Sequence, residues 1–248
     1  MKDKPDIETF FRTADACWWN PNCGNDNRFW FFKAQSRYIE RELERCIGGQ
    51  KDITALDAGC GRGIHSCLLQ KLGCRTTSLD INPDMLKLTG TISNSTLVEG
   101  TLMNMPFDNK TFEIVISIGT SMHVKSISIM LSEIHRVLKN NGIAIISMAN
   151  KFSLYILWTT KINHRLVQHQ KLYHRTQSTF WEFKRMLPGQ NFKIISSRGF
   201  AVIPPISLET GWRKNLISPL TSKILSFPLD WVLGQYFGCG VTFVIRKK

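Results

Sequence analysis

The chain has 248 residues, of which 43% are hydrophobic and 21% are charged, which are ordinary values for a globular protein. No run of about 18 uncharged apolar residues occurs, which argues against a membrane-spanning helix, and we expect no signal peptide. The net charge of +13 is uneven: residues 1–150 carry 17 Lys or Arg and 16 Asp or Glu, whereas residues 151–248 carry 15 and 3. The basic part could serve nucleic acid, an anionic membrane surface or an anionic substrate, or it could be a solvated surface without a partner.

The cysteine and histidine spacings do not predict a metal site. The cysteines at 60, 67 and 74 are seven residues apart, and no C-x-x-C pair occurs. Three histidines in 164–174 are spaced by five, whereas ligands on one helix face are three or four residues apart. We therefore expect no metal, reduced thiols and a cytoplasmic protein.

The N-terminal segment is unusually aromatic. Residues 1–35 include Phe10, Phe11, Trp18, Trp19, Phe29, Trp30, Phe31 and Phe32. A helix is predicted over 28–46, with Glu and Arg on its outer face and two glycines after its end. The aromatic side chains could cover a ligand pocket or could merely cap a sheet.

A glycine-rich turn follows a short apolar strand at 53–56. The turn is Asp57-Ala58-Gly59-Cys60-Gly61-Arg62-Gly63, and a helix is predicted over 64–72 with apolar residues at 64, 68, 69 and 72. The glycines let the backbone turn sharply and let a cofactor lie against it. A dinucleotide site prefers G-x-G-x-x-G, in which the third glycine comes one residue later. A tight loop without a ligand is the alternative.

The second predicted strand, 74–80, ends in an acid. Asp80 comes 17 residues after Gly63, where a carboxylate can accept hydrogen bonds from ribose hydroxyls. Ile81 could pack on an adenine ring, and Asn82 with Pro83 begins the next helix. An ordinary loop aspartate is the alternative for Asp80.

Strands and helices continue to alternate up to residue 149. A strand over 95–100 precedes Gly100-Thr101-Leu102-Met103-Asn104-Met105-Pro106-Phe107. A strand over 114–119 is apolar on both faces, as a central parallel strand is, and His123 comes after it. The segment 132–139 predicts a helix that Asn140-Asn141-Gly142 ends, and 143–148 is a fifth strand.

Residues 52–149 resemble the UbiE-like branch (methyltransferase type 11) of the class I S-adenosylmethionine (SAM) methyltransferases. Four motifs occur in the right order: the glycine loop after Asp57, the acid at 80, the Gly, Pro and Phe of 100–107, and E-x-x-R-V-L-K at 133–139. The resemblance implies SAM as the cofactor, bound by Asp57, Gly59, Cys60, Gly61, Gly63, Asp80, Ile81, Thr101, Leu102, Met103 and Ile118. The family commonly has an aspartate at the position of Thr101, so adenine recognition would rest more on the backbone of Leu102 and Met103.

The resemblance also implies an α/β fold. We expect a Rossmann-like, seven-stranded, mostly parallel sheet with its last strand antiparallel and helices on both faces. A single domain over 1–248 would comprise a cover segment at 1–50, a SAM-binding core at 51–149, and acceptor-side insertions with the final strands at 150–248. A capping box predicts a helix that begins after Thr179 and ends at 188–189, and strands are predicted at 191–197 and 241–245. The N-terminal, mid-chain and C-terminal insertions would form a cover.

The implied reaction is methyl transfer from SAM to a small or lipophilic metabolite, such as a quinone-, terpenoid- or polyketide-like molecule. His123 is the candidate catalytic base, with a pocket-wall residue as the alternative. The aromatic and apolar insertions favour the lipophilic acceptor. RNA is the less favoured acceptor because no RNA-binding module is recognisable, and a non-catalytic SAM-fold partner subunit is a third hypothesis. Apolar and basic residues mixed over 204–240 could pack over the pocket or contact an anionic membrane.

Overall fold

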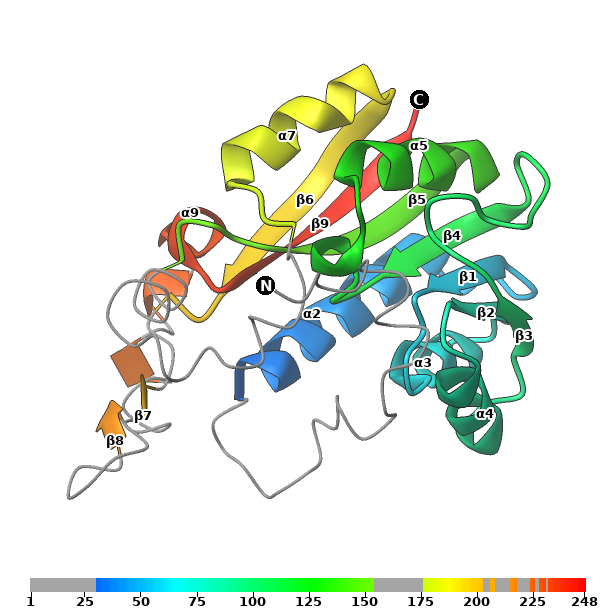
Figure 1. Cartoon of the computed structure of the whole chain (residues 1–248), viewed down its shortest axis with the longest axis horizontal. Coiled ribbons are helices and arrows are strands. Elements are labelled where there is room, and N and C mark those ends of the chain that lie inside the picture. Colours follow the sequence, from blue (N-terminus) through cyan, green and yellow to red (C-terminus); the bar gives the residue numbers. More distant parts are fainter. Residues whose placement is uncertain are drawn as a thin grey trace, which may run out of the picture.

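The computed structural model describes residues 30–153, 176–202, 206–207, 215–217, 224–225, 228–230 and 232–248. These residues form a seven-stranded sheet with the strand order β3-β2-β1-β4-β5-β9-β6 (Figure 1). The seven strands are β1 (Thr54–Ala58), β2 (Arg75–Asp80), β3 (Thr96–Glu99), β4 (Phe112–Ser117), β5 (Leu138–Ala149), β6 (Phe192–Phe200) and β9 (Gly240–Lys247). A separate pair consists of β7 (Ile206–Ser207) and β8 (Asn215–Ile217).

The strand directions confirm the expected fold. The pairs β1–β2, β2–β3, β1–β4 and β4–β5 are parallel, whereas β9 is antiparallel to both of its neighbours, β5 and β6. The chain builds outward from β1 to β3 and then crosses back to place β4 on the other side of β1. In open sheets of this kind, ligands bind outside the carboxyl ends of the strands at such a reversal. The fold therefore points to the ends of β1, β2 and β4.

Helices cover both faces of the sheet (Figure 1). They are α2 (Trp30–Ile47), α3 (Ile64–Lys71), α4 (Pro83–Ile92), the short 3-10 helix η3 (Ser121–His123), α5 (Ile127–Val137), α7 (Phe180–Gly189) and α9 (Gly234–Phe237). One apolar core lies between the sheet and α5 and α7, and includes Leu131 and Phe183. A second core lies under α2 and α3, and includes Leu43 and Leu69. Burial on both faces explains the apolar runs at 114–116 in β4 and 143–146 in β5.

One local prediction was wrong. The helix predicted through residue 139 ends at Val137, because β5 already begins at Leu138, which pairs with Phe112. Of the four apolar positions noted on α3, Leu69 is buried and Leu68 and Leu72 pack against the core, whereas Ile64 is 50% exposed. The aromatic residues before Trp30 and most of the two acceptor-side insertions lie outside the described residues. Within the described part of the chain, no helix is both long and apolar enough to cross a bilayer.

A buried lysine closes the end of α5. Lys247 on β9 is only 5% exposed, and its Nζ donates hydrogen bonds to the carbonyl oxygens of His135 at 2.6 Å and Leu138 at 2.7 Å. The last carbonyls of a helix lack partners within the helix and carry its negative dipole end. The Lys247 ammonium therefore supplies hydrogen bonds to two of these carbonyl oxygens and a positive charge at the negative end of the helix dipole.

We predict that Lys247→Met lowers the free energy of unfolding by about 1.5–3 kcal/mol, because two hydrogen bonds to a charged group are lost. Denaturant unfolding followed by circular dichroism measures the change. Arg246→Met, at the exposed neighbouring position, is the matched control and should change stability by less than about 0.5 kcal/mol. Equal effects of the two substitutions would contradict this role of Lys247.

Candidate cofactor and catalytic site

The glycine loop between β1 and α3 has a backbone that requires glycine. Gly59, Gly61 and Gly63 have φ values of 79°, 52° and 77°, in the left-handed region that other L-residues seldom adopt. The N–H groups of Gly59 and Cys60 both donate to the carbonyl oxygen of Leu79, at 2.7 and 2.9 Å. These bonds tie the loop to the end of β2.

The loop is tightly packed behind two of its glycines and open at the third. A Cβ on Gly59 would lie 2.6 Å from Cγ2 of Thr120, and one on Gly63 would lie 2.8 Å from Cγ2 of Thr89. Thr89 also donates its hydroxyl to the carbonyl oxygen of Gly61 at 2.9 Å. In contrast, a Cβ on Gly61 would meet no atom within 4 Å. The surface at Gly61 can therefore accept a ligand that lies directly against the backbone.

Asp80 at the end of β2 holds this open part of the loop. Its Oδ2 accepts from the N–H of Gly61 at 2.8 Å, and its Oδ1 accepts from the N–H of Asn82 at 2.9 Å. Burial raises the pKa of Asp80, while these backbone hydrogen bonds act in the opposite direction. A carboxylate can accept about four hydrogen bonds, so both oxygens retain capacity for ribose hydroxyls. Ile81 is half-buried beside it, and the Asn82 side chain caps α4 as predicted.

Asp57 and Cys60 lie beneath the loop rather than on its open side. The Asp57 carboxylate is buried and accepts from the Ser66 hydroxyl at 2.6 Å, and burial raises its pKa to about 7. Cys60 is also buried, with its Sγ 3.5 Å from Oγ1 of Thr89, and burial raises the pKa of its thiol. Both side chains therefore support the loop from its buried side and not from its open side.

The segment that follows β3 is held by two charged residues of α5. Arg136 forms an ion pair with Glu133 at 2.8 Å and donates to the carbonyl oxygens of Met105 and Phe107 at 2.9 and 2.6 Å. Glu133 in turn accepts from the Met105 N–H at 2.7 Å. The E-x-x-R spacing puts the two side chains one helical turn apart. Glu133 and Arg136 together therefore hold the backbone of the turn that contains Pro106 and Phe107.

Thr101 affects which backbone groups of the next two residues are available to an adenine ring. The Thr101 hydroxyl accepts from the Met103 N–H at 3.2 Å, so this backbone donor is already engaged. The Leu102 side chain is buried in the core under α5, which leaves only its backbone for contact with a ligand. Adenine recognition by backbone groups would thus depend on Leu102 more than on Met103.

The turn after β4 completes the site. Ile118 is half-buried, and Gly119, with a φ of 75°, has open space where a Cβ would lie. The Gly119 N–H donates to Oγ of Ser147 at 2.7 Å. His123 ends η3, is half-buried, and donates its N–H to the carbonyl oxygen of Thr120 at 2.8 Å. Because Thr120 touches Gly59, the structure brings the turn that carries His123 against the glycine loop.

The carboxyl ends of three strands therefore bring together the glycine loop, Asp80 and the turn that ends at His123. Sequence analysis missed Thr89, Gly119, Thr120 and Ser147; only Gly119, a glycine directly after a buried strand, carried a signal. In the described part of the chain, no cluster of three His, Cys, Asp or Glu side chains could hold a metal ion. Backbone left open at two glycines beside a carboxylate suits a nucleoside cofactor such as SAM.

We predict that Gly61→Val weakens SAM binding at least ~10-fold, because the added side chain would occupy the open surface of the loop. Gly73→Val is the matched control: Gly73 also has a positive φ, 83°, and no atom within 4 Å of a Cβ, but it lies at the far end of α3. Both variants should lose similar stability. Isothermal titration calorimetry should show weaker SAM binding for Gly61→Val alone, and equal SAM affinities would count against this site.

Comparison with known proteins agrees with the geometry. Residues 56–146 match the family described as "Methyltransferase domain". The chain is 29% identical over 192 residues to an uncharacterized protein of Methanocaldococcus jannaschii, covering 76% of this chain and 74% of that one. It is 27% identical over 190 residues to a demethylmenaquinone methyltransferase of Staphylococcus aureus, covering 67% and 78%.

The fold also resembles solved structures. The crystal structure of a SAM-dependent methyltransferase from Thermotoga maritima superposes with a TM-score of 0.59 at 15% identity, covering 98% of this chain and 100% of that one. The matched family segment begins in β1 and ends in β5, so it contains the glycine loop, Asp80 and His123. Residues 56–146 thus match a methyltransferase domain, the chain is similar to UbiE-like quinone methyltransferases, and these findings support a SAM-dependent methyltransferase.

Proposed function

We propose that this enzyme transfers the methyl group of SAM to a small, lipophilic acceptor, with a quinone-like ring as the preferred class. The observation that carries this proposal is the contact between Gly59 and Thr120, which puts the His123 turn next to the cofactor loop. The similarity to the demethylmenaquinone methyltransferase of Staphylococcus aureus supports the acceptor class.

For the cofactor, we infer that Asp80 accepts hydrogen bonds from the ribose hydroxyls and that Ile81 packs on the adenine. The free capacity of the Asp80 oxygens supports the first role. The backbone of Leu102 and the side chain of Thr101 would lie at the adenine edge. Gly61, Gly119 and Ile118 would flank the methionine part, with Asp57, Cys60 and Gly63 supporting the loop from behind.

SAM, when bound, supplies a methyl group that is already electrophilic because it is attached to a sulfonium. The chain must therefore align the acceptor atom, exclude water and, for a hydroxyl or a carbon acid, remove a proton. His123 is our candidate base. Its half-buried position at the end of η3 suits a group that meets both the acceptor and solvent. Thr176 donates its hydroxyl to the carbonyl oxygen of Val124 at 2.6 Å, so the chain after the mid-chain insertion returns beside this turn.

We predict that His123→Gln lowers the methyl-transfer rate by ~10²-fold or more and removes a limb of the pH–rate profile near neutrality, because the base is lost. SAM affinity should not change. His135→Gln, a change on α5 against Phe192, is the control and should keep the wild-type rate. Wild-type turnover by His123→Gln across the pH range would contradict a role as base and leave His123 as a residue that only lines the pocket.

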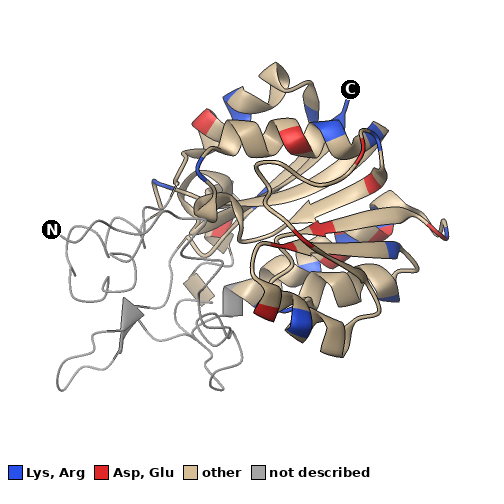
Figure 2. Ribbon diagram, turned by 45° about the vertical axis from the view of Figure 1, so that its right-hand side comes forward, with Lys and Arg blue, Asp and Glu red and all other residues tan. Residues whose placement is uncertain are grey.

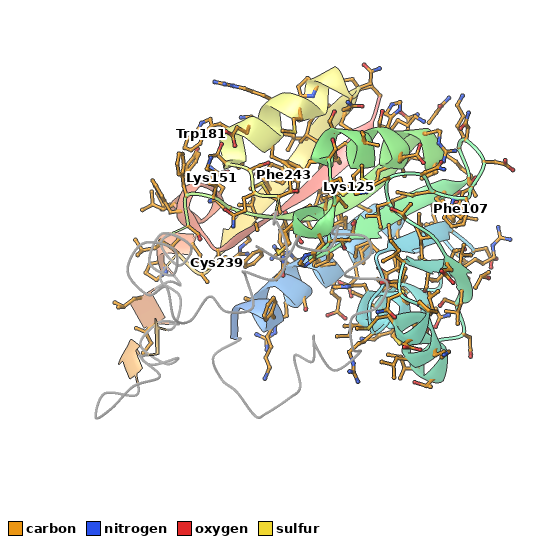
Figure 3. All side chains as sticks on the ribbon, in the orientation of Figure 1. Phe107, Lys125, Lys151, Trp181, Cys239 and Phe243 are labelled. Atoms are coloured by element: carbon orange, nitrogen blue, oxygen red, sulfur yellow. The ribbon has the colours of Figure 1, made fainter. Side chains whose placement is uncertain are left out.

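We further propose that the enzyme meets its acceptor at an anionic membrane surface. Trp181 at the start of α7 is 44% exposed and stacks on Tyr236 with ring centroids 4.9 Å apart, and Phe152 is 45% exposed. Trp181 and Lys151 lie at the same end of the sheet (Figure 3), where the N–H of Lys151 bonds to the carbonyl oxygen of Ser178. Exposed rings with neighbouring basic side chains suit the boundary of lipid headgroups.

The described part of the chain carries only some of the basic excess that motivated this proposal. Figure 2 shows Lys and Arg interspersed with Asp and Glu over the described ribbon. Lys184 and Arg185 on α7 are exposed and lie three and four residues after Trp181. Other basic positions of 151–248, including Arg213 and Lys214, lie outside the described residues.

We predict that the protein co-sediments with anionic but not with neutral vesicles, because the basic side chains are attracted to anionic headgroups, and that Lys184→Glu combined with Arg185→Glu reduces this binding at least ~5-fold. Lys71→Glu with Lys87→Glu makes the same change in charge on α3 and α4, and should have a smaller effect. Equal binding to both vesicle types, or none to either, would contradict a membrane role. RNA binding with a steep salt dependence would favour the alternative acceptor.

A further inference from the structure

The turn that carries His123 has little structure of its own. It is the 3-10 helix η3, which spans Ser121–His123, and the His123 N–H donates to the carbonyl oxygen of Thr120 at 2.8 Å. Hydrogen bonds in a 3-10 helix have poorer geometry than those in an α-helix, and three residues form few of them. At its start, Ser121 donates its hydroxyl to the carbonyl oxygen of Ser147 on β5 at 2.8 Å. The position of His123 therefore depends on contacts from distant parts of the chain.

Thr176 holds the other end of this turn. Its N–H donates to the carbonyl oxygen of Met122 at 3.1 Å, and its hydroxyl donates to that of Val124 at 2.6 Å. These carbonyl groups belong to the residues directly before and after His123. The β-branched side chain of threonine has few rotamers, so the hydroxyl loses little freedom when it forms this bond. One residue thus fixes the backbone on both sides of His123.

Thr176 is in turn connected to the sheet. Ser178, two residues later, is buried and forms a parallel bridge with Asn150, which directly follows β5. The Lys151 N–H donates to the carbonyl oxygen of Ser178 at 3.0 Å, and the buried Asn150 donates its side-chain amide to the carbonyl oxygen of Tyr236 at 2.7 Å. Residues 176–178 therefore link the His123 turn to a well-packed part of the fold.

We propose that Thr176 is a positioning residue for methyl transfer, which holds His123 at the distance and angle needed to remove a proton from the acceptor. This inference rests on the proposed role of His123 as base. A base must lie within about 2.6–3.2 Å of the group it deprotonates, and a misplacement of about 1 Å can lower a rate ~100-fold. Without the Thr176 hydroxyl, the carbonyl group of Val124 loses this bond, and the backbone after His123 is less restrained.

Thr176→Val tests this role, because it removes the hydroxyl and keeps the backbone N–H and the branched shape. With a simple naphthoquinol as the test acceptor, we expect kcat to fall ~10-fold and the KM for SAM to stay unchanged. Thr176→Ser, which keeps the hydroxyl, should restore most of the rate. Thr111→Val is the matched control: Thr111 also donates its N–H and its hydroxyl to two carbonyl oxygens, those of Val137 at 2.8 Å and Asp108 at 2.7 Å, but at the opposite end of β4. Its rate should equal that of the wild type.

A double variant separates positioning of His123 from a general loss of structure. In the His123→Gln background, Thr176→Val should change the rate by less than ~2-fold, because the group that it positions is already absent. The same ~10-fold loss with and without His123 would overturn the inference, and so would a wild-type kcat in Thr176→Val. A slow His123→Gln beside a wild-type Thr176→Val would contradict this inference alone. A wild-type rate in His123→Gln would instead overturn the base role, and this inference with it.

Amide hydrogen exchange measured by NMR supplies a second readout that needs no acceptor. We expect the His123 amide to exchange ~10-fold faster in Thr176→Val than in the wild type, because the turn opens more often, while amides within β4 keep their rates. If the naphthoquinol is not methylated at all, the proposed acceptor class is wrong, and the exchange rates still decide whether Thr176 holds the turn. An unchanged exchange rate at His123 in Thr176→Val would overturn the inference.

Discussion

The hydrogen bond from the Gly61 N–H to the Asp80 carboxylate, 2.8 Å long, is the interaction on which the site depends. It joins the end of β2 to the one part of the glycine loop that faces open space. The positive φ of Gly61 aims this N–H at the carboxylate, and a side chain there would fill the space a ligand needs. A hydrogen bond to a charged group contributes about 1.5–3 kcal/mol, enough to fix the loop before the cofactor arrives.

The rest of the fold serves to bring strand ends together. Parallel pairing of β2, β1 and β4 aligns their carboxyl ends, and apolar cores on both faces leave the strands no room to shift. Contacts between side chains then join the connecting loops: Thr89 supports the glycine loop from α4, and Thr120 contacts it from the turn after β4. The Glu133–Arg136 pair fixes the segment after β3 in the same way. The chemistry of methyl transfer needs this alignment more than it needs reactive side chains.

Much of this arrangement could be predicted because it depends on residues close together in the sequence. Positive φ values, helix caps at Asn82 and Thr179, and apolar strands each require particular residue types at a few neighbouring positions. Contacts between residues distant in the sequence require no such local pattern. The apolar spacing on α3 did not reveal that Ser66 is buried, where its hydroxyl donates to Asp57, nine residues earlier. Thr120 and Ser147 were missed for the same reason.

The central claim is that Asp80 and the loop it holds form the SAM site. Calorimetric titration of SAM into the wild-type protein and into Asp80→Ala tests it most directly, with circular dichroism to show that both are folded. The account predicts that the wild-type protein binds SAM and that Asp80→Ala binds it ~10- to 100-fold more weakly, since a charged hydrogen-bond acceptor is lost. Equal SAM affinity in two folded proteins, or no SAM binding by the wild type, would contradict it.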